Sequence, residues 1–333
     1  MRRLDFISII RIFSVFSIIA FHSLCFYKGN WLFLHTETIP IWKVLALPLV
    51  KIGLFTFFFI SGFLFGFNSI EKGKYENISA FIFTKIQRIL LPYLIWSFYM
   101  VASFSFYIWH DILIGAAHLW FLLTLFEMFI IIIVLKKIQI LNTNPYIDFI
   151  TISLSFILLY AWRYSKEYYY LLCINNTLYY LPTFIIGFYC AKYQLHHSSK
   201  KKTSAIAFII SITILFVLSY LSTIESNTPI EIDLAIRITS CIAAVSALVM
   251  TNKIKIPNKY TAIINNLDHN SMGIYIFNQI VVFVVLLIPV CRQFLEIHYL
   301  IGPFIIFFVS FFIPWGLAAL FNKTKYLSWM IGT

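Results

Sequence analysis

The chain has 333 residues, of which 61% are hydrophobic and 11% are charged, and its formal net charge is +12. A soluble domain averages about 25% charged residues, so this composition excludes a soluble enzyme, a disordered chain and a secreted disulfide scaffold. Together with a mean hydropathy of +0.88, it predicts an integral membrane protein.

Neither the cysteines nor the positive charge indicates a metal or a nucleic-acid partner. The five cysteines are dispersed, with no CxxC pair and no zinc-ligand spacing. The neighbours His196 and His197 stand in a run of Ser and Lys, which favours a solvated loop over a metal site. No basic helix, zinc finger or aromatic RNA-binding pattern accompanies the charge. In a membrane chain, an excess of Lys and Arg is typical of cytoplasmic loops and so indicates the orientation of the spans.

Ten runs are apolar and long enough to cross a bilayer as helices, which takes about 20 residues. They lack the period-two alternation of a β-barrel. We expect an all-α bundle forming one domain over residues 1–333, without an appended soluble domain. The predicted spans are 6–27, 44–67, 89–108, 119–135, 147–162, 178–191, 204–223, 232–250, 271–290 and 303–321.

The distribution of Lys and Arg predicts how these spans are oriented. With the N-terminus in the cytoplasm, 17 of the 25 basic residues fall in cytoplasmic segments and 5 in outer segments. Such an excess on one side is the positive-inside pattern. We therefore expect both termini in the cytoplasm and the lipid bilayer as the surroundings of the chain.

Arg11 and His22 lie in the first predicted span, where an ionisable group costs about 2.5–3.5 kcal/mol on insertion scales. Eleven residues at about 100° each bring them to nearly one helix face, roughly 16 Å apart along the axis. One reading is functional, because Arg suits phosphate and a neutral His can take a proton from a hydroxyl. The other is that Arg11 reaches to the inner interface and His22 lies at the outer one.

Two further cations, Lys85 and Arg88, precede the apolar run that begins at Ile89. They are either ordinary anchors of the positive-inside kind or a clamp for the phosphates of a nucleotide-like donor.

His118 and Trp120 open the fourth predicted span, and Glu127 follows inside it. Trp120 alone is explained as an interface aromatic. Glu127 is costly in a bilayer without a partner, so we expect it to pair with a cation of another span. The candidate cations are Arg11, Lys51 and Arg237.

A small pair, Ser61 and Gly62, interrupts the aromatic second span. Close helix packing is the common reason for such a pair. A nucleophilic serine is the alternative, although no G-x-S-x-G turn surrounds it.

Six segments together resemble the membrane acyltransferase-3 family of bacterial integral-membrane enzymes. The first is an Arg and a His separated by ten residues, here Arg11 and His22. The others follow in order along the chain: 57–63 (FFFISGF), 85–96 (KIQRILLPYLIW), 118–122 (HLWFL), 181–187 (LPTFIIG) and 271–275 (SMGIY). Two positions depart from the family pattern. Ser8 stands where members usually have Asp, and Asn278-Gln279 stands where they often have His-Pro.

The resemblance implies transfer of an acyl group, most often acetyl, from cytoplasmic acetyl-CoA or another acyl-CoA to a sugar hydroxyl. The acceptor would be O-antigen, capsule or another lipid-linked envelope glycan at the bacterial inner membrane, with no metal required. Lys85 and Arg88 would hold the CoA phosphates, and Arg11 would position the donor. His22 would either deprotonate the acceptor or take the acyl group first.

Other residues are candidates for contacts with the substrate or with the oxyanion that forms during acyl transfer. They are Ser61, His118, Trp120, Glu127 and Tyr275. The alternative function is a carrier that flips a lipid-linked sugar or exports a small solute. Broken-helix repeats would favour the carrier, and the sequence shows none.

Overall fold

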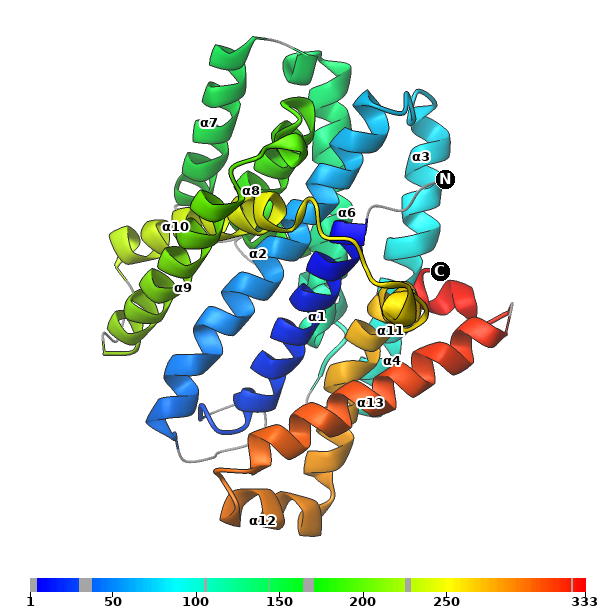
Figure 1. Ribbon diagram of the computed structural model, residues 1–333. Coiled ribbons are helices and arrows are strands. Elements are labelled where there is room, and N and C mark those ends of the chain that lie inside the picture. The colour runs from blue at the N-terminus through cyan, green and yellow to red at the C-terminus, as the bar shows by residue number, and fades with distance from the viewer. Residues whose placement is uncertain are drawn as a thin grey trace. The chain divides into compact units, whose positions relative to one another are not determined.

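The computed structural model describes residues 5–29, 38–104, 107–142, 144–163, 171–224, 229–324 and 326–333. Most of these residues are helical, and no strand occurs among them (Figure 1). The all-α fold predicted from the sequence is therefore confirmed.

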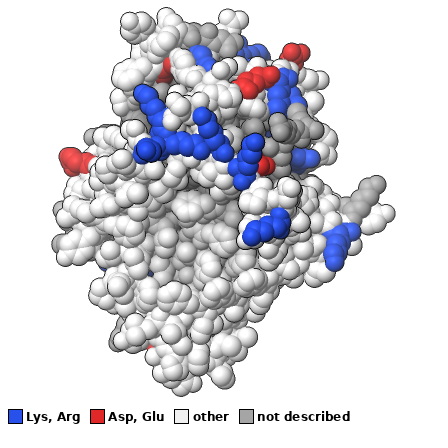
Figure 2. All heavy atoms as spheres, in the orientation of Figure 1, with Lys and Arg blue, Asp and Glu red and all other residues white. Residues whose placement is uncertain are grey.

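Ten helical segments within the described ranges are long and apolar enough to span a bilayer. Each contains most of one predicted span, so the ten predicted spans are confirmed as helices of suitable length and hydropathy. On the face drawn in Figure 2, wide areas carry no charged side chain, as contact with lipid tails requires. The segments are Asp5–Cys25, Pro40–Ile70, Ile78–Ser103, Asp111–Lys137, Pro145–Trp162, Leu171–Lys192, Lys201–Ser222, Ile230–Thr251, Asn258–Leu287 and Gly302–Lys323.

The chain packs as two compact units, and the boundary between them falls inside helix α2 (Pro40–Ile70). Unit 1 comprises residues 1–57 and 196–324, and unit 2 comprises residues 58–195 and 325–333. Besides its part of α2, unit 1 contains α1 (Asp5–Cys25), α9 (Lys201–Ile224), α10 (Ile230–Thr251), α11 (Asn258–Leu287), α12 (Pro289–Ile297) and α13 (Gly302–Lys323). Unit 2 contains α3 (Ile78–Lys85), α4 (Leu91–Ser103), α5 (Asp111–Ile114), α6 (Trp120–Lys137), α7 (Pro145–Arg163) and α8 (Ile174–Lys192).

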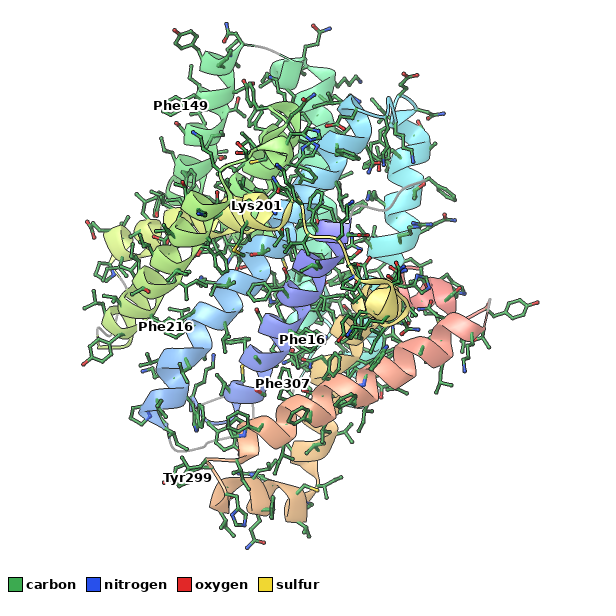
Figure 3. All side chains as sticks on the ribbon, in the orientation of Figure 1. Phe16, Phe149, Lys201, Phe216, Tyr299 and Phe307 are labelled. Atoms are coloured by element: carbon green, nitrogen blue, oxygen red, sulfur yellow. The ribbon has the colours of Figure 1, made fainter. Side chains whose placement is uncertain are left out.

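In unit 1, α11 packs against both α1 and α13, and α1 also contacts α13. Aromatic rings fill the contact between α1 and α13. The rings of Phe16 and Phe307 stack with centroids 6.1 Å apart, and Phe16 also lies 4.7 Å from Phe311 (Figure 3). Such ring pairs contribute about 0.5–1.5 kcal/mol beyond the area they bury, so α1 is held firmly against its neighbours.

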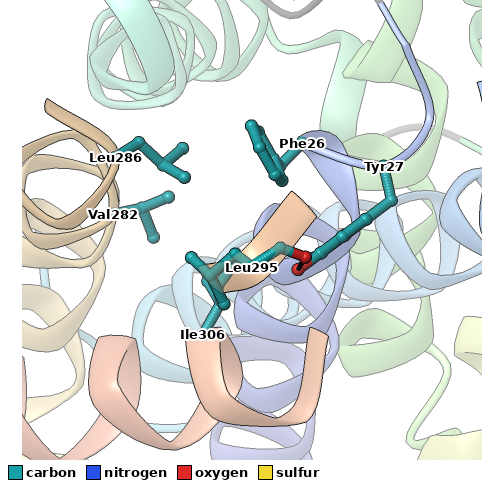
Figure 4. Packing of buried hydrophobic residues seen from close by; sticks show 6 residues of the cluster. All are labelled: Phe26, Tyr27, Val282, Leu286, Leu295 and Ile306. Atoms are coloured by element: carbon teal, nitrogen blue, oxygen red, sulfur yellow. Dashed lines mark hydrogen bonds between the residues drawn. The ribbon is translucent and has the colours of Figure 1, made fainter. Parts of the chain in front are cut away.

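A buried apolar cluster closes one end of unit 1 (Figure 4). The phenol of Tyr27 donates a hydrogen bond to the carbonyl of Leu295 at 3.2 Å, so the one polar atom of this ring is satisfied. The cluster fixes the segment that follows α1 against α11 and the short helix α12. Its members are Phe26, Tyr27, Val282, Leu286, Leu295 and Ile306.

In unit 2, glycines let α2 and α8 approach backbone to backbone. A Cβ on Gly62 would lie 1.9 Å from the carbonyl oxygen of Phe184, and a Cβ on Gly187 would lie 2.1 Å from that of Phe59. Small residues at a helix contact are the usual basis of such close packing in membranes. The Ser61-Gly62 pair thus has a structural reason at Gly62.

The third span carries a π-helical turn, Ile86–Leu90, between α3 and α4. Pro92 lies two residues beyond it, and a proline ring inside a helix conflicts with the carbonyl four residues before, here Arg88. A wider π turn is one way to accommodate this conflict. Lys85 ends α3 directly before this turn, and Arg88 lies within it.

Two spans start more than ten residues earlier than the sequence predicts. The third starts at Ile78 rather than at residue 89, because the Asn77 side chain caps α3 by accepting from the Ala80 amide at 3.0 Å. The ninth starts at Asn258 rather than at residue 271. Its polar run, which suggests a loop, is helical because its buried side chains find partners on neighbouring helices. Asn270, for example, accepts from Asn322 at 2.7 Å.

Candidate functional site

Arg11 forms an ion pair with a carboxylate from α11. Its Nη1 lies 2.6 Å from Oδ1 of Asp268, whose side chain is only 3% exposed. The other oxygen of the same carboxylate accepts a hydrogen bond from the Ser8 hydroxyl at 2.9 Å. The resemblance leads us to expect Asp at position 8. In this chain the carboxylate beside Arg11 comes from another helix, and the Ser8 hydroxyl bonds to it.

His22 is also held by α11. Its Nδ1 lies 2.5 Å from Oδ1 of Asn278, and both side chains are buried. Nδ2 of the same amide donates to the carbonyl of Ser310 on α13 at 2.9 Å. The Asn278 amide thus connects the histidine to two helices. Burial of polar groups in a membrane bundle is tolerable because each finds a partner.

The two contacts match in register because α1 and α11 run in the same direction. At the start of α1, Asp5 accepts from the amide of Ile256, two residues before α11, at 3.3 Å. Further along, Arg11 meets Asp268 and His22 meets Asn278, so the contacts follow in increasing order along both helices. Eleven residues separate the two polar side chains on α1 and ten separate their partners on α11, which are nearly equal lengths at about 1.5 Å per residue. Successive spans of a multi-pass chain alternate in direction. The first and ninth spans therefore run the same way, in agreement with this parallel packing.

The structure thus gives Arg11 and His22 the shared face that the sequence predicts. Arg11 keeps 26% of its side-chain surface exposed, whereas His22 is 7% exposed. Tyr275, a third candidate, is 4% exposed and lies between Asp268 and Asn278 along α11. These three candidates belong to unit 1.

The cations Lys85 and Arg88 belong to unit 2. Nζ of Lys85 lies 3.8 Å from the centroid of the Phe129 ring and 5.2 Å from that of Phe81. Arg88, three residues on, is exposed. Neither forms an ion pair with another described residue. Aromatic faces hold a cation without neutralising it, so the ring contacts of Lys85 leave it without a carboxylate partner among the described residues.

Glu127 of α6 accepts a hydrogen bond from the Thr177 hydroxyl of α8 at 2.5 Å. This bond comes from a neutral hydroxyl rather than from the cation that the sequence suggested. Trp120, two turns earlier on α6, stacks on Tyr180 of α8 with centroids 5.8 Å apart. The remaining candidates of unit 2 are the buried His118 and the partly exposed Ser61.

Sequence reasoning missed the partners that α11 and α8 supply. Asp268 lies outside the predicted ninth span, and Thr177 is an ordinary helix residue by its sequence. One signal was available. Asp268 and Asn278 are ten residues apart, close to the spacing of Arg11 and His22. Buried polar groups in two spans at matched spacing indicate a helix pair.

These features define a multi-pass helical membrane protein with an Arg–His track that a second helix holds in place. Residues 4–323 match the family described as "Acyltransferase domain", the acyltransferase-3 family, and the chain belongs to it. The resemblance found in the sequence is therefore confirmed over nearly the whole chain, and membership implies acyl transfer. No curated protein and no solved structure was found to match.

Proposed function

We propose that this protein is an O-acyltransferase of the bacterial inner membrane, with both termini in the cytoplasm. It moves an acetyl group from cytoplasmic acetyl-CoA to a hydroxyl of a cell-envelope glycan, such as a lipid-linked O-antigen or capsule precursor. The observation that carries the proposal is the Arg11–His22 track, held on one face of α1 by Asp268 and Asn278.

The chemistry of the track suits acyl transfer. A buried histidine within hydrogen-bond reach of an acceptor hydroxyl can remove its proton as the oxygen attacks a thioester. Arg11 provides a permanent positive charge about 16 Å further along the helix. The donor is an extended polyanion, so a cation and a base separated along one face fit its phosphate end and its thioester end.

The paired cations of unit 2 suit the phosphates of CoA. Lys85 and Arg88 lie near the end of the span that we assign to the cytoplasm, and no described carboxylate neutralises them. Charge-assisted hydrogen bonds from such groups are the strong contacts in phosphate recognition. Donors such as the indole of Trp120 or the phenol of Tyr275 are candidates for stabilising the oxyanion. We assign Glu127, His118 and Ser61 to contacts with the acceptor.

The proposal is tested by mass spectrometry of envelope glycan from cells with and without the protein. Wild type is expected to add the mass of one acetyl group per repeat unit, and His22→Ala is expected to abolish the increment while the protein still reaches the membrane. His298→Ala is the matched control, because His298 is an exposed histidine outside the spans, and it should acylate normally.

Three other outcomes of this experiment would lead to different conclusions. Normal acylation by His22→Ala would overturn the role of His22. An increment of another acyl mass would keep the enzyme and change the donor. Unchanged glycan mass, with glycan accumulating on one side of the membrane, would favour the carrier.

A further inference from the structure

The amide of Asn278 has one possible orientation. The carbonyl of Ser310, 2.9 Å from one end of this amide, can only accept a hydrogen bond. The NH₂ group must therefore point to Ser310, which turns the amide oxygen towards His22. The opposite orientation would place two carbonyl oxygens against each other.

That orientation decides which ring nitrogen of His22 carries a proton. Nδ1 faces the amide oxygen of Asn278 at 2.5 Å, and this oxygen can only accept. A bond between them exists only if Nδ1 bears hydrogen. In a neutral imidazole the lone pair then belongs to Nε2.

We propose that Asn278 is a positioning residue that fixes His22 as the Nδ1–H tautomer and makes Nε2 the basic atom. The proposal rests on the proposed acyl transfer and names the reacting atom of that site. Through its Ser310 contact, Asn278 also links the orientation of the ring to α13.

The resulting step is balanced. Nε2 of His22 takes the proton of the acceptor hydroxyl while its oxygen forms a bond to the thioester carbonyl carbon. The carbon–sulfur bond then breaks with its electron pair going to sulfur, and the proton passes from Nε2 to the thiolate. The products are the ester and free CoA thiol. Throughout, Nδ1–H keeps its bond to Asn278, whose carbonyl dipole favours the positive charge that the ring carries transiently.

Nitrogen NMR of detergent-solubilised, histidine-labelled protein tests the tautomer without turnover, because protonated and unprotonated ring nitrogens have widely separated shifts. The His22 signals are assigned by their loss in His22→Gln. We expect proton-bearing Nδ1 and unprotonated Nε2 in the wild type, and loss of this preference in Asn278→Leu.

Kinetics test the consequence. Asn278→Leu removes both amide bonds at similar volume. It is expected to lower kcat about 10–100-fold, part of the roughly 10²–10⁴-fold that a positioned general base contributes, with the KM for acetyl-CoA nearly unchanged. Asn278→Asp still accepts from Nδ1–H but cannot donate to the Ser310 carbonyl, so it should keep the Nδ1–H signal and recover kcat only in part. Asn270→Leu is the control, because Asn270 is also 1% exposed on α11 but bonds to Asn322. It should leave kcat per folded protein and the His22 signals unchanged.

The outcomes separate this proposal from the proposed function. A proton on Nε2 in the wild type, or unchanged kcat and nitrogen shifts in Asn278→Leu, would overturn the tautomer assignment even if acyl transfer is established. An Nδ1–H signal in a protein that transfers no acyl group would overturn the proposed function and leave the tautomer standing.

Discussion

The charge of Arg11 is paired with that of Asp268, a residue far away in the sequence. The two residues stand 257 positions apart and form a 2.6 Å contact in which the carboxylate is almost fully buried. Removing one partner of such a pair leaves the other charge uncompensated, which costs about 3–5 kcal/mol for a fully buried pair. Arg11 is partly exposed, so the cost here should be lower.

The double variant Arg11→Met/Asp268→Leu separates stability from activity. Asp268→Leu alone is expected to lower the melting temperature and the amount of folded protein, because it leaves Arg11 without its carboxylate. The double variant should recover stability but not acyl transfer, since apolar side chains replace a buried ion pair at little cost. Thermal unfolding in detergent and the glycan assay measure both. Equal melting temperatures for Asp268→Leu and wild type would contradict this account of the pair.

Lys85 and Arg88 give a prediction about donor affinity. Lys85→Met combined with Arg88→Gln is expected to raise the KM for acetyl-CoA about tenfold or more while changing kcat less, because the lost contacts are to phosphates remote from the thioester. Steady-state kinetics at two salt concentrations measure this, and the variant should depend less on salt than the wild type. Lys137→Gln, an exposed lysine at the end of α6, is the control. A similar rise in the KM of Lys137→Gln would indicate that overall surface charge, rather than direct contact with Lys85 and Arg88, attracts the donor.

At the scale of elements, the contact of α2 with α8 is set by two glycines rather than by large apolar side chains. Gly62 and Gly187 each bring their helix against the backbone of the other. Aromatic rings then pack around the contact, as with Phe58, whose centroid lies 4.7 Å from that of Phe121. The position of α8, and with it the Thr177 hydroxyl that holds Glu127, follows from this close approach.

Gly62→Ala is therefore expected to destabilise the protein strongly, because its Cβ would overlap a carbonyl oxygen at 1.9 Å and the two backbones must separate. Gly316→Ala is the matched control, since a Cβ at Gly316 on α13 meets nothing within 4 Å. Thermal unfolding in detergent should show a lowered midpoint for the first variant and an unchanged one for the second. If both variants have the same unfolding midpoint as the wild type, the backbones of α2 and α8 are not in close contact at Gly62.

The span boundaries show where local sequence fails at the element scale. The apolar core of every span is visible in the sequence because length and hydropathy are local properties. The ninth span was predicted to start at residue 271 because the residues before it are polar. Asp268 and Asn270 are nevertheless helical and buried, since Arg11 and Asn322 satisfy them. A polar stretch becomes part of a buried helix only through such partners.

For the whole molecule, the excess of Lys and Arg predicts an orientation that labelling can measure. In a protein whose native cysteines are replaced, a cysteine introduced at Ser199 should react with a membrane-impermeant maleimide only after permeabilisation. One at Leu300 should react in intact spheroplasts. Both residues are exposed and lie between candidate spans. Labelling with the reverse accessibility would place the termini outside.

The sequence by itself determined that the chain is an all-α membrane protein with ten spans, and it identified the family and the pair Arg11 and His22. Composition, run length and spacing along one helix are properties of a continuous segment, so they need no knowledge of neighbours. The tertiary structure alone decided which groups hold that pair. Asp268 and Asn278 reach Arg11 and His22 only because α11 packs parallel to α1 in matched register. This helix contact joins residues more than 250 positions apart in the sequence, so it forms only when the intervening helices have packed.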